Sequence, residues 1–218
     1  MTAQIQSQSS FIDKEDTMLL LVDCQPGLSL AAESRSHQQL VDNIVALVRT
    51  ATVFGIPIVS TTSATQRFSG PVWPAITNLL PTSPMERHAL NADDDPSVRQ
   101  AMEATGRKTM VIAGLLTEAC VSFPALSLSA RGFRVSIVAD CCAGVNAETH
   151  QLALQRLAAA SIGVTSWLQL LLEWQQDWTN TETYAGAIGV LADLGGAYGL
   201  ALQHARDMLV SPAASPAS

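Results

Sequence analysis

Short apolar segments alternate with longer amphipathic segments along most of this chain. The segments Met18–Val22 and Met110–Ala113 are continuously apolar, which is typical of strands that helices cover on both faces. In Gln38–Phe54 the apolar residues recur at helical spacing instead, and a Gly-Ile-Pro sequence ends that pattern. The full pattern predicts six strands, at Thr17–Asp23, Ile56–Thr62, Met85–His88, Lys108–Gly114, Phe133–Ala139 and Gly163–Ser166.

The segments between these strands predict helices. Pro96–Thr105 and Ala147–Ala160 have helical spacing, so strands and helices alternate, as in an α/β fold with a parallel sheet. From Trp167 on, the chain is helical, and the Ala- and Gly-rich helices at about 182–210 are expected to pack against other copies of the chain. We expect one domain over residues 1–210 and a disordered tail of Ser, Pro and Ala at 211–218.

Composition and charge narrow the classes of function. The chain has 218 residues, of which 48% are hydrophobic and 14% charged, which excludes a disordered or coiled-coil protein. Its net charge of −7 argues against nucleic acid or an anionic membrane as a partner. Residues 1–16 lack a basic region followed by an apolar one, so we expect a cytoplasmic protein. The apolar stretch Ala185–Leu202 contains five glycines and Asp193, which predicts a packing surface rather than a membrane span.

The cysteines and acidic runs do not predict a metal site. Four cysteines are present, Cys24, Cys120, Cys141 and Cys142. They are too few for a disulfide scaffold and lack the C-x-x-C spacing of a zinc site, so we interpret them as free thiols. The run Asp93-Asp94-Asp95 before a proline predicts an acidic helix N-terminus. We therefore expect no bound metal and no cofactor.

Candidate chemistry lies at the carboxyl ends of the predicted strands, where parallel sheets bind ligands. Asp23, Arg87 and Cys120 follow different strands, so a carboxylate, a guanidinium and a thiol are expected at one edge. Thr117 is a candidate N-cap for a helix that begins beside Cys120, and a helix N-terminus lowers the pKa of a nearby thiol. Glu118, in contrast, would repel a thiolate. The other residues at these strand ends are Thr61-Thr62-Ser63, His88 and Asp140-Cys141-Cys142.

Each candidate also has a simpler interpretation. Cys120 would then be a small buried hydrophobic residue, Asp23 would cap the loop after its strand, and Arg87 would form a structural ion pair. Cys24, Cys141 and Cys142 are interpreted as packing residues. His88 and His150 could both reach the same edge, so a Cys/His pair is a further alternative.

Several segments of the sequence resemble the isochorismatase-like cysteine hydrolases. They are LLVDCQPG at 20–27, VIAGLLTEACV at 111–121, and GFRV at 132–135 followed by Asp140. The segments FPALS at 123–127 and WQQDW at 174–178 are most similar to the YcaC subgroup of bacterial hydrolases. The resemblance extends from about Asp13 to Asp177 and more weakly to Val210, and the spacing between Asp23 and the G-x-x-T-[DE]-x-C-V segment is specific.

The resemblance implies a fold and an arrangement of catalytic groups. The fold is a three-layer Rossmann-like α/β fold with a six-stranded parallel sheet, helices on both faces and extra C-terminal helices. The groups are an Asp–Lys–Cys triad that cleaves C–N bonds of small amides, with Cys120 as the nucleophile and Asp23 as the general base and acid. The Leu115–Leu116 peptide is expected to be cis, and the backbone N–H groups of Leu116 and Cys120 to form the oxyanion hole.

The lysine of that triad has no counterpart here. The chain has two lysines: Lys14 precedes the first predicted strand and Lys108 begins the fourth, so both lie at the edge opposite to the candidate thiol. About seven strand residues at ~3.3 Å each separate Lys108 from that thiol, beyond the reach of its side chain. Arg87 matches the family lysine, with Asn91 beyond it as in the subgroup pattern Arg-x-x-x-Asn. An arginine can hold the triad by charge but cannot transfer a proton, because its pKa exceeds about 12.

We therefore expect a cysteine-dependent hydrolase that cleaves an amide-type C–N bond of a small-molecule substrate through a thioester intermediate, using an Asp–Arg–Cys variant of the triad. The expected walls of the substrate pocket are Gln25, Trp73, Asn91 and Phe123. The resemblance also implies a homo-oligomer, with octameric rings as the expected form.

A second hypothesis comes from a different class of protein. The missing lysine and the neighbouring Glu118 would also fit a catalytically degenerate or redox-sensing protein that binds a metabolite on the hydrolase fold. A dinucleotide-binding oxidoreductase is disfavoured, because no G-x-G-x-x-G motif follows the first strand.

Overall fold

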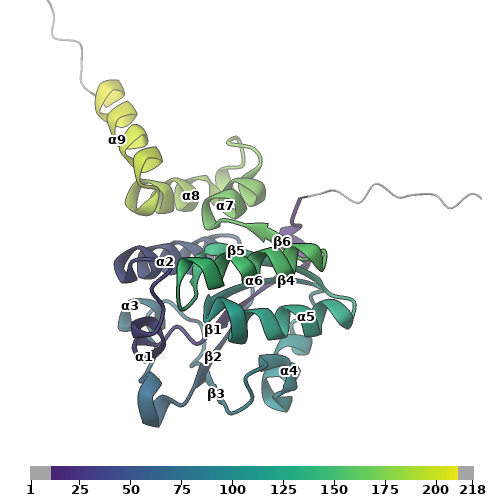
Figure 1. The fold of residues 1–218 in the computed structure, drawn as a ribbon. Coiled ribbons are helices and arrows are strands. Elements are labelled where there is room, and N and C mark those ends of the chain that lie inside the picture. The colour runs from purple at the N-terminus through teal and green to yellow at the C-terminus, as the bar shows by residue number, and fades with distance from the viewer. Residues whose placement is uncertain (1–10, 211–218) are drawn as a thin grey trace, which may run out of the picture.

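The centre of the protein is a six-stranded, all-parallel sheet with strand order β3-β2-β1-β4-β5-β6 (Figure 1). The computed structural model describes residues 11–210, so the predicted tail at 211–218 lies outside the described residues. The α/β fold and the parallel sheet are confirmed. The strands are β1 (Thr17–Val22), β2 (Ile58–Ser63), β3 (Met85–Arg87), β4 (Thr109–Leu115), β5 (Arg134–Ala143) and β6 (Gly163–Thr165).

Helices cover both faces of the sheet (Figure 1). α2 and α7 pack together on one face, and α4, α5 and α6 lie on the other. Because strands are added in both directions outward from β1, the chain reverses between β1 and β4, and in parallel sheets ligands bind at the carboxyl edge near such a point. The helices are α1 (Pro26–Leu30), α2 (His37–Val53), α3 (Pro74–Thr77), α4 (Pro96–Ala104), α5 (Ser122–Ala130), α6 (Ala147–Ala159), α7 (Trp167–Gln175), α8 (Thr181–Leu194) and α9 (Ala197–Val210), with short helical turns η1 (Lys14–Asp16), η2 (Thr65–Ser69), η3 (Ala92–Asp94) and η4 (Thr117–Val121).

Side-chain caps fix where several of these helices begin. The Ser36 hydroxyl accepts a hydrogen bond from a backbone N–H of the first turn of α2, and Asn146 and Ser166 do the same for α6 and α7. Asp95 caps α4 and is followed by Pro96, whose missing N–H costs nothing in a first turn. The N-termini of these four helices are therefore encoded locally.

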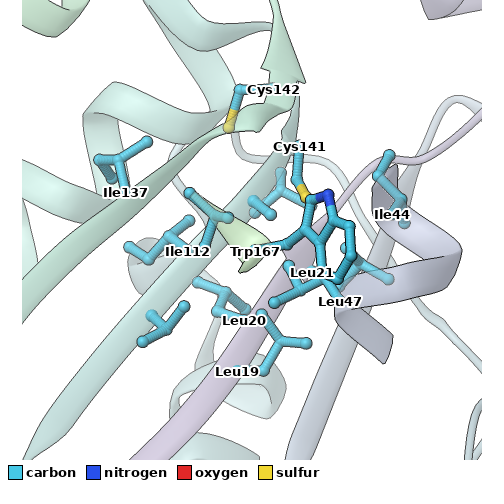
Figure 2. Packing of buried hydrophobic residues seen from close by; sticks show 14 of the residues in the cluster. Leu19, Leu20, Leu21, Ile44, Leu47, Ile112, Ile137, Cys141, Cys142 and Trp167 are labelled. Atoms are coloured by element: carbon cyan, nitrogen blue, oxygen red, sulfur yellow. The ribbon is translucent and has the colours of Figure 1, made fainter. Parts of the chain in front are cut away.

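The core lies on both sides of β1 and β4, whose residues are all buried. Figure 2 shows Leu19, Leu20 and Leu21 of β1 among side chains of α2, β4 and β5. Cys141 and Cys142 point to opposite faces of β5, with Cys141 against the Trp167 ring (Figure 2). All four cysteines are free, and Cys24, Cys141 and Cys142 are completely buried, as expected of packing residues.

The bounds of the predicted strands differ from the structure, most of them by one residue. β5 extends to Ala143 rather than ending at Ala139, because its pairing with β4 shifts between Ile112 and Gly114 and then continues. This irregularity in register leaves no trace in the hydrophobic pattern. β2 begins at Ile58 rather than Ile56, and it extends one residue further than predicted, to Ser63.

The C-terminal helices differ in how they are held. α8 packs on α2 and α7, whereas α9 projects away from the body and contacts mainly α8 (Figure 1). Leu200, Met208 and Leu209 of α9 are exposed. No single helix within residues 11–210 is long and apolar enough to cross a membrane, and α8 and α9 pass that test only as a pair bent by 114°.

Candidate active site

Asp23 lies at the carboxyl end of β1 and is completely buried. Its φ of +50° is a left-handed conformation, which Asp adopts more readily than most non-glycine residues. The Thr61 hydroxyl donates to Oδ1 at 2.9 Å, and the Ser63 hydroxyl donates to Oδ2 at 3.2 Å. The backbone N–H of Asp23 donates to the Thr61 carbonyl at 3.0 Å. Both carboxylate oxygens are therefore fixed by the end of β2.

Arg87, the last residue of β3, forms an ion pair with the Asp23 carboxylate. Both side chains are fully buried. The guanidinium also donates to the carbonyl oxygens of Ala89 and Leu90, the latter at 3.2 Å, and to the Thr61 hydroxyl at 3.4 Å. Its orientation is thus set by four partners, and the loop after β3 is tied to the site.

Cys120 completes the cluster from η4, the turn that follows β4. Its residue surface is 6% exposed. Burial raises the pKa of the Cys120 thiol, and the negative charge of Asp23 raises it further, while a hydrogen bond and the charge of Arg87 oppose both effects. The thiol therefore interacts with both other groups, and the three residues are brought together as predicted from the strand ends.

Burial also raises the pKa of the Asp23 carboxyl group. Arg87 and hydrogen bonds from Thr61, Ser63 and the Cys120 thiol lower it and offset part of the effect of burial. A carboxyl group whose proton affinity is increased, next to a thiol, has the properties of an acid–base group.

The expected lowering of the thiol pKa by a helix N-terminus is not found. Thr117 does not cap a helix, because its hydroxyl is 2.8 Å from Nδ1 of His150 instead. α5 begins only at Ser122, after the Cys120 turn. Burial and the adjacent Asp23 therefore have the largest effects on the pKa of the Cys120 thiol, and both raise it. Glu118 points elsewhere, with Oε1 accepting from the backbone N–H of Val145 at 2.9 Å.

The backbone before Cys120 has the features expected of the site. The Leu115–Leu116 peptide is cis, as the resemblance implies. The Leu116 carbonyl accepts from the N–H groups of Ala119 and Val121, both at 3.1 Å, whereas the Leu116 N–H donates to no other residue within the described chain. At the end of β4, Gly114 has a φ of +127°, and a Cβ there would lie 1.8 Å from the Val22 carbonyl oxygen. Only glycine allows β1 and β4 to approach so closely beside the site.

The residues predicted to line the pocket have other partners. The Gln25 amide is fully engaged, since its oxygen accepts from the Ser63 N–H at 2.9 Å and its nitrogen donates to Thr65 and Gly70. The remaining three are Asn91, which caps η3, Trp73, which precedes α3 and is partly buried, and Phe123, which is 36% exposed on α5. Their contact with a substrate stays a prediction.

A cavity of about 680 Å³ adjoins the cluster on the β2–β3 side. Ser63 and Arg87, which both contact Asp23, form part of its wall, together with the loop 64–68. Glu86 and Gln25 hold this loop from two sides, through Thr65 and Gly70. None of the predicted pocket residues lies in this wall, and the sequence carried no periodic or motif signal for the loop.

Other candidates at the carboxyl edge do not join the cluster. Asp140 lies within β5, and its carboxylate accepts from the backbone N–H of Trp167 at 3.0 Å. His88 is exposed at the cavity wall, and within residues 11–210 neither His88 nor His150 is hydrogen-bonded to the Cys120 thiol. The described residues contain no group of His, Cys, Asp and Glu arranged to hold a metal ion.

Both lysines lie at the opposite edge of the sheet, as predicted. Lys14 precedes β1, and its Nζ is 5.7 Å from the centroid of the Phe54 ring. Lys108 precedes β4, and its Nζ is 5.1 Å from the Phe133 ring. Arg87 is the cation that faces Asp23.

Comparison with known proteins agrees with this geometry. The Isochorismatase domain model matches residues 17–169. A relative in Escherichia coli strain K12, named "Probable hydrolase YcaC", is 35% identical over 171 residues, which are 78% of this chain and 82% of that protein.

Solved structures give the same result. The structure of E. coli YcaC, described as an octameric hydrolase of unknown specificity, superposes with a TM-score of 0.87 at 33% identity and covers 93% of this chain and 99% of that one. YcaC from Pseudomonas aeruginosa, with hexane-2,5-diol and covalent acrylamide, gives a TM-score of 0.85 at 31% identity and covers 90% and 98%. The chain therefore belongs to the isochorismatase family, and it is a YcaC-like hydrolase.

Proposed function

We propose that this hydrolase cleaves an amide-type C–N bond of a small molecule with Cys120 as the nucleophile, Asp23 as the proton-transfer group and Arg87 as an electrostatic anchor. The observation that carries the proposal is the position of the Asp23 carboxylate, which is buried and interacts with both the Arg87 guanidinium and the Cys120 thiol. Buried acid–base groups whose pKa values are shifted by such partners are typical of active sites.

In the first half-reaction the Asp23 carboxylate takes the proton from the Cys120 sulfur. The thiolate then attacks the substrate carbonyl carbon, and the carbonyl oxygen becomes an oxyanion. The backbone N–H groups of Leu116 and Cys120 would stabilise this oxyanion, and the Leu116 N–H is available because it has no partner within the described chain. When the C–N bond breaks, Asp23 returns its proton to the departing amine, leaving a thioester.

In the second half-reaction a water molecule attacks the thioester carbonyl. Asp23, again a carboxylate, accepts a proton from this water, and the C–S bond breaks as the carboxylic acid product forms. The proton passes from Asp23 to the Cys120 sulfur, which restores the starting state. The raised pKa of Asp23 suits both directions of transfer, because it brings the proton affinity of the carboxyl group closer to that of its partners.

Arg87 acts through charge and geometry. An arginine side chain is effectively always charged, so the guanidinium exchanges no proton in this mechanism. It opposes the two influences that raise the pKa of the Cys120 thiol, and it holds one oxygen of Asp23. A lysine in this position could also give up and take back a proton. Arg87 can supply only positive charge and hydrogen bonds.

A relative supports a reactive thiol. Acrylamide is an electrophile that adds to thiolates, and the P. aeruginosa protein carries it covalently. We expect Cys120 to be the residue here that reacts in this way, because the other three thiols are completely buried. Acrylamide is therefore a usable probe of the site.

The space for the substrate and the assembly are also proposed. The cavity of about 680 Å³ beside Ser63 and Arg87 is in the range of small-molecule sites, roughly 300–1,000 Å³. We expect one part of the substrate to lie there, against the loop 64–68.

We further propose a ring-like homo-octamer, from the octameric state named for E. coli YcaC.

The redox-sensing alternative has less support. Sensor thiols have a low pKa, are accessible and lie next to a resolving cysteine. The Cys120 thiol has a raised pKa and little exposed surface, and its three fellow cysteines are sealed in the core. A degenerate, ligand-binding protein is the outcome that the following experiment would reveal.

The test compares Cys120→Ala with Cys142→Ala, a matched change of another buried thiol. A panel of small amides and thioesters is screened for release of amine or thiol, and acrylamide addition is followed by intact mass. Cys120→Ala should abolish both turnover and addition while its Tm stays close to wild type. Cys142→Ala should retain both. Turnover by the Cys120→Ala protein would overturn the nucleophile assignment, and a reactive Cys120 with no turnover on any substrate class would favour the degenerate alternative.

A further inference from the structure

A buried hydrogen bond lies behind the nucleophile and is not used in the mechanism above. The Thr117 side chain is completely buried, and its Oγ1 is 2.8 Å from Nδ1 of His150. Thr117 comes directly after Leu116 and three residues before Cys120. His150 belongs to the first turns of α6, a helix that contributes nothing else to the cluster.

The turn that carries Cys120 is held mostly by bonds within itself. The Leu116 carbonyl accepts from the N–H groups of Ala119 and Val121, and the Ser122 hydroxyl donates to the Thr117 carbonyl. These bonds shape the turn but do not fix its place against the rest of the protein. That connection comes from two adjacent side chains that both reach the start of α6: Thr117 to His150, and Glu118 to the Val145 N–H.

The surroundings of His150 keep its imidazole neutral. Its surface is 4% exposed, and burial lowers its pKa below the ordinary value. Two charged groups face it: Arg35 lowers the pKa further, and Glu118 raises it. A buried, neutral imidazole needs a hydrogen-bond partner, because an unsatisfied buried polar group is costly. The Thr117 hydroxyl is that partner, in either tautomer of the ring.

We propose that His150 is a positioning residue for the nucleophile: through the Thr117 hydroxyl it fixes the turn that holds the Leu116 N–H and the Cys120 thiol against Asp23. This proposal rests on the proposed function, since it assigns His150 a role in that same site. It differs from the Cys/His pair considered from the sequence, because the imidazole acts on Cys120 through Thr117 and exchanges no proton with it.

The test uses variants that remove or keep one hydrogen bond. His150→Leu and Thr117→Val each remove it, whereas His150→Asn places a polar atom where Nδ1 lies. The readout is the second-order rate of acrylamide addition to Cys120, together with kcat and KM once a substrate is known. Small displacements of a reacting group have large kinetic effects, so we expect His150→Leu and Thr117→Val each to slow acrylamide addition roughly tenfold. The double variant should be no slower than either single variant. His150→Asn should react at a rate within about threefold of wild type.

A control separates positioning from general loss of stability. Leu154→Ala also truncates a buried residue of α6, but it leaves the Thr117–His150 bond intact. It should lower Tm and keep the rate of addition. Equal slowing by Leu154→Ala, or wild-type rates in Thr117→Val, would overturn the proposal. If His150→Leu does not fold, Thr117→Val decides alone. Turnover that survives Cys120→Ala would instead refute the proposed function, whatever the His150 variants show.

Discussion

Two aspartates are completely buried and paired with arginines, and they differ in where the arginine charge lies. The carboxylate of Asp93, in η3, accepts from Arg131 and the Ser127 hydroxyl, and Arg99 donates to the Asp93 backbone carbonyl with its Nε 3.4 Å from the carboxylate. The side chains of Arg131 and Arg99 are 31% and 42% exposed, so their charges stay hydrated. Asp23 has one arginine partner, and Arg87 is as buried as the aspartate itself.

This difference separates a structural ion pair from a functional one. At Asp93 two partly hydrated arginines join η3, α4 and α5, and neither cation is removed from water, so the arrangement can stabilise the fold. At the Asp23–Arg87 pair both charges are desolvated, and replacing such a pair with apolar residues is often neutral or stabilising. Stability alone therefore does not explain why the Asp23–Arg87 pair is present. The raised pKa of Asp23 and its contact with Cys120 give the pair a chemical reason.

Replacing each carboxyl group by an amide should give the largest contrast. Asp23→Asn removes the proton-transfer group, so turnover should fall by about 10²–10⁴-fold, the range of general acid–base catalysis. Asp93→Asn should leave kcat near wild type and lower Tm instead. The measurement is kcat beside a thermal melt for both variants. Comparable losses of kcat in the two variants would contradict the assignment of Asp23 as functional and Asp93 as structural.

Removal of the arginines should give the next largest contrast, in stability. Arg87→Ala leaves the Asp23 carboxylate buried without its cation, which should lower the free energy of unfolding by about 3–5 kcal/mol. Arg131→Ala should cost about 1 kcal/mol, because Arg99 and Ser127 still face Asp93 and the lost cation was partly hydrated. Urea unfolding at neutral pH measures both. A larger loss in Arg131→Ala would show that hydration of the partner is not the deciding factor.

The smallest and sharpest contrast is in the titration of Cys120. Because the thiol pKa is raised, acrylamide addition should be slow near neutral pH and should increase as pH rises past the ordinary thiol range. Arg87→Gln should move the midpoint upward, since Arg87 lowers the thiol pKa. Asp23→Asn should move it downward, since the charge of Asp23 raises it. Arg131→Gln should leave the midpoint in place, and a shift in that control would implicate charge at long range.

Most of the sheet could be predicted from the sequence because its strands carry a strong local signal. β1 and β4 contain the unbroken apolar runs Met18–Val22 and Met110–Ala113, and strands buried on both faces typically have such runs. The end of β5 could not be predicted, since the register shift beside Gly114 depends on pairing between distant segments. Asp140 was therefore expected at the carboxyl edge, although it lies within the strand and bonds to Trp167.

The site divides in the same way. Asp23, Arg87 and Cys120 were predictable, because parallel strands bring their carboxyl ends to one edge and a family motif marks each position. The Thr61 and Ser63 hydroxyls stood at a predicted strand end, but their bonds to Asp23 depend on the register of β1 and β2. The direction of the thiol pKa and the bond from Thr117 to His150 depend on burial and on a helix thirty residues away, which no local pattern encodes.

The distribution of lysines has a practical consequence for handling the protein. Lys14 and Lys108 both lie at the amino edge of the sheet, over the rings of Phe54 and Phe133, whereas Arg87 is the cation that faces Asp23 at the carboxyl edge. Lysine-directed labels, cross-linkers or surface coupling should therefore attach at the amino edge of the sheet, away from the candidate site. This chain is suited to oriented immobilisation without any change to its sequence.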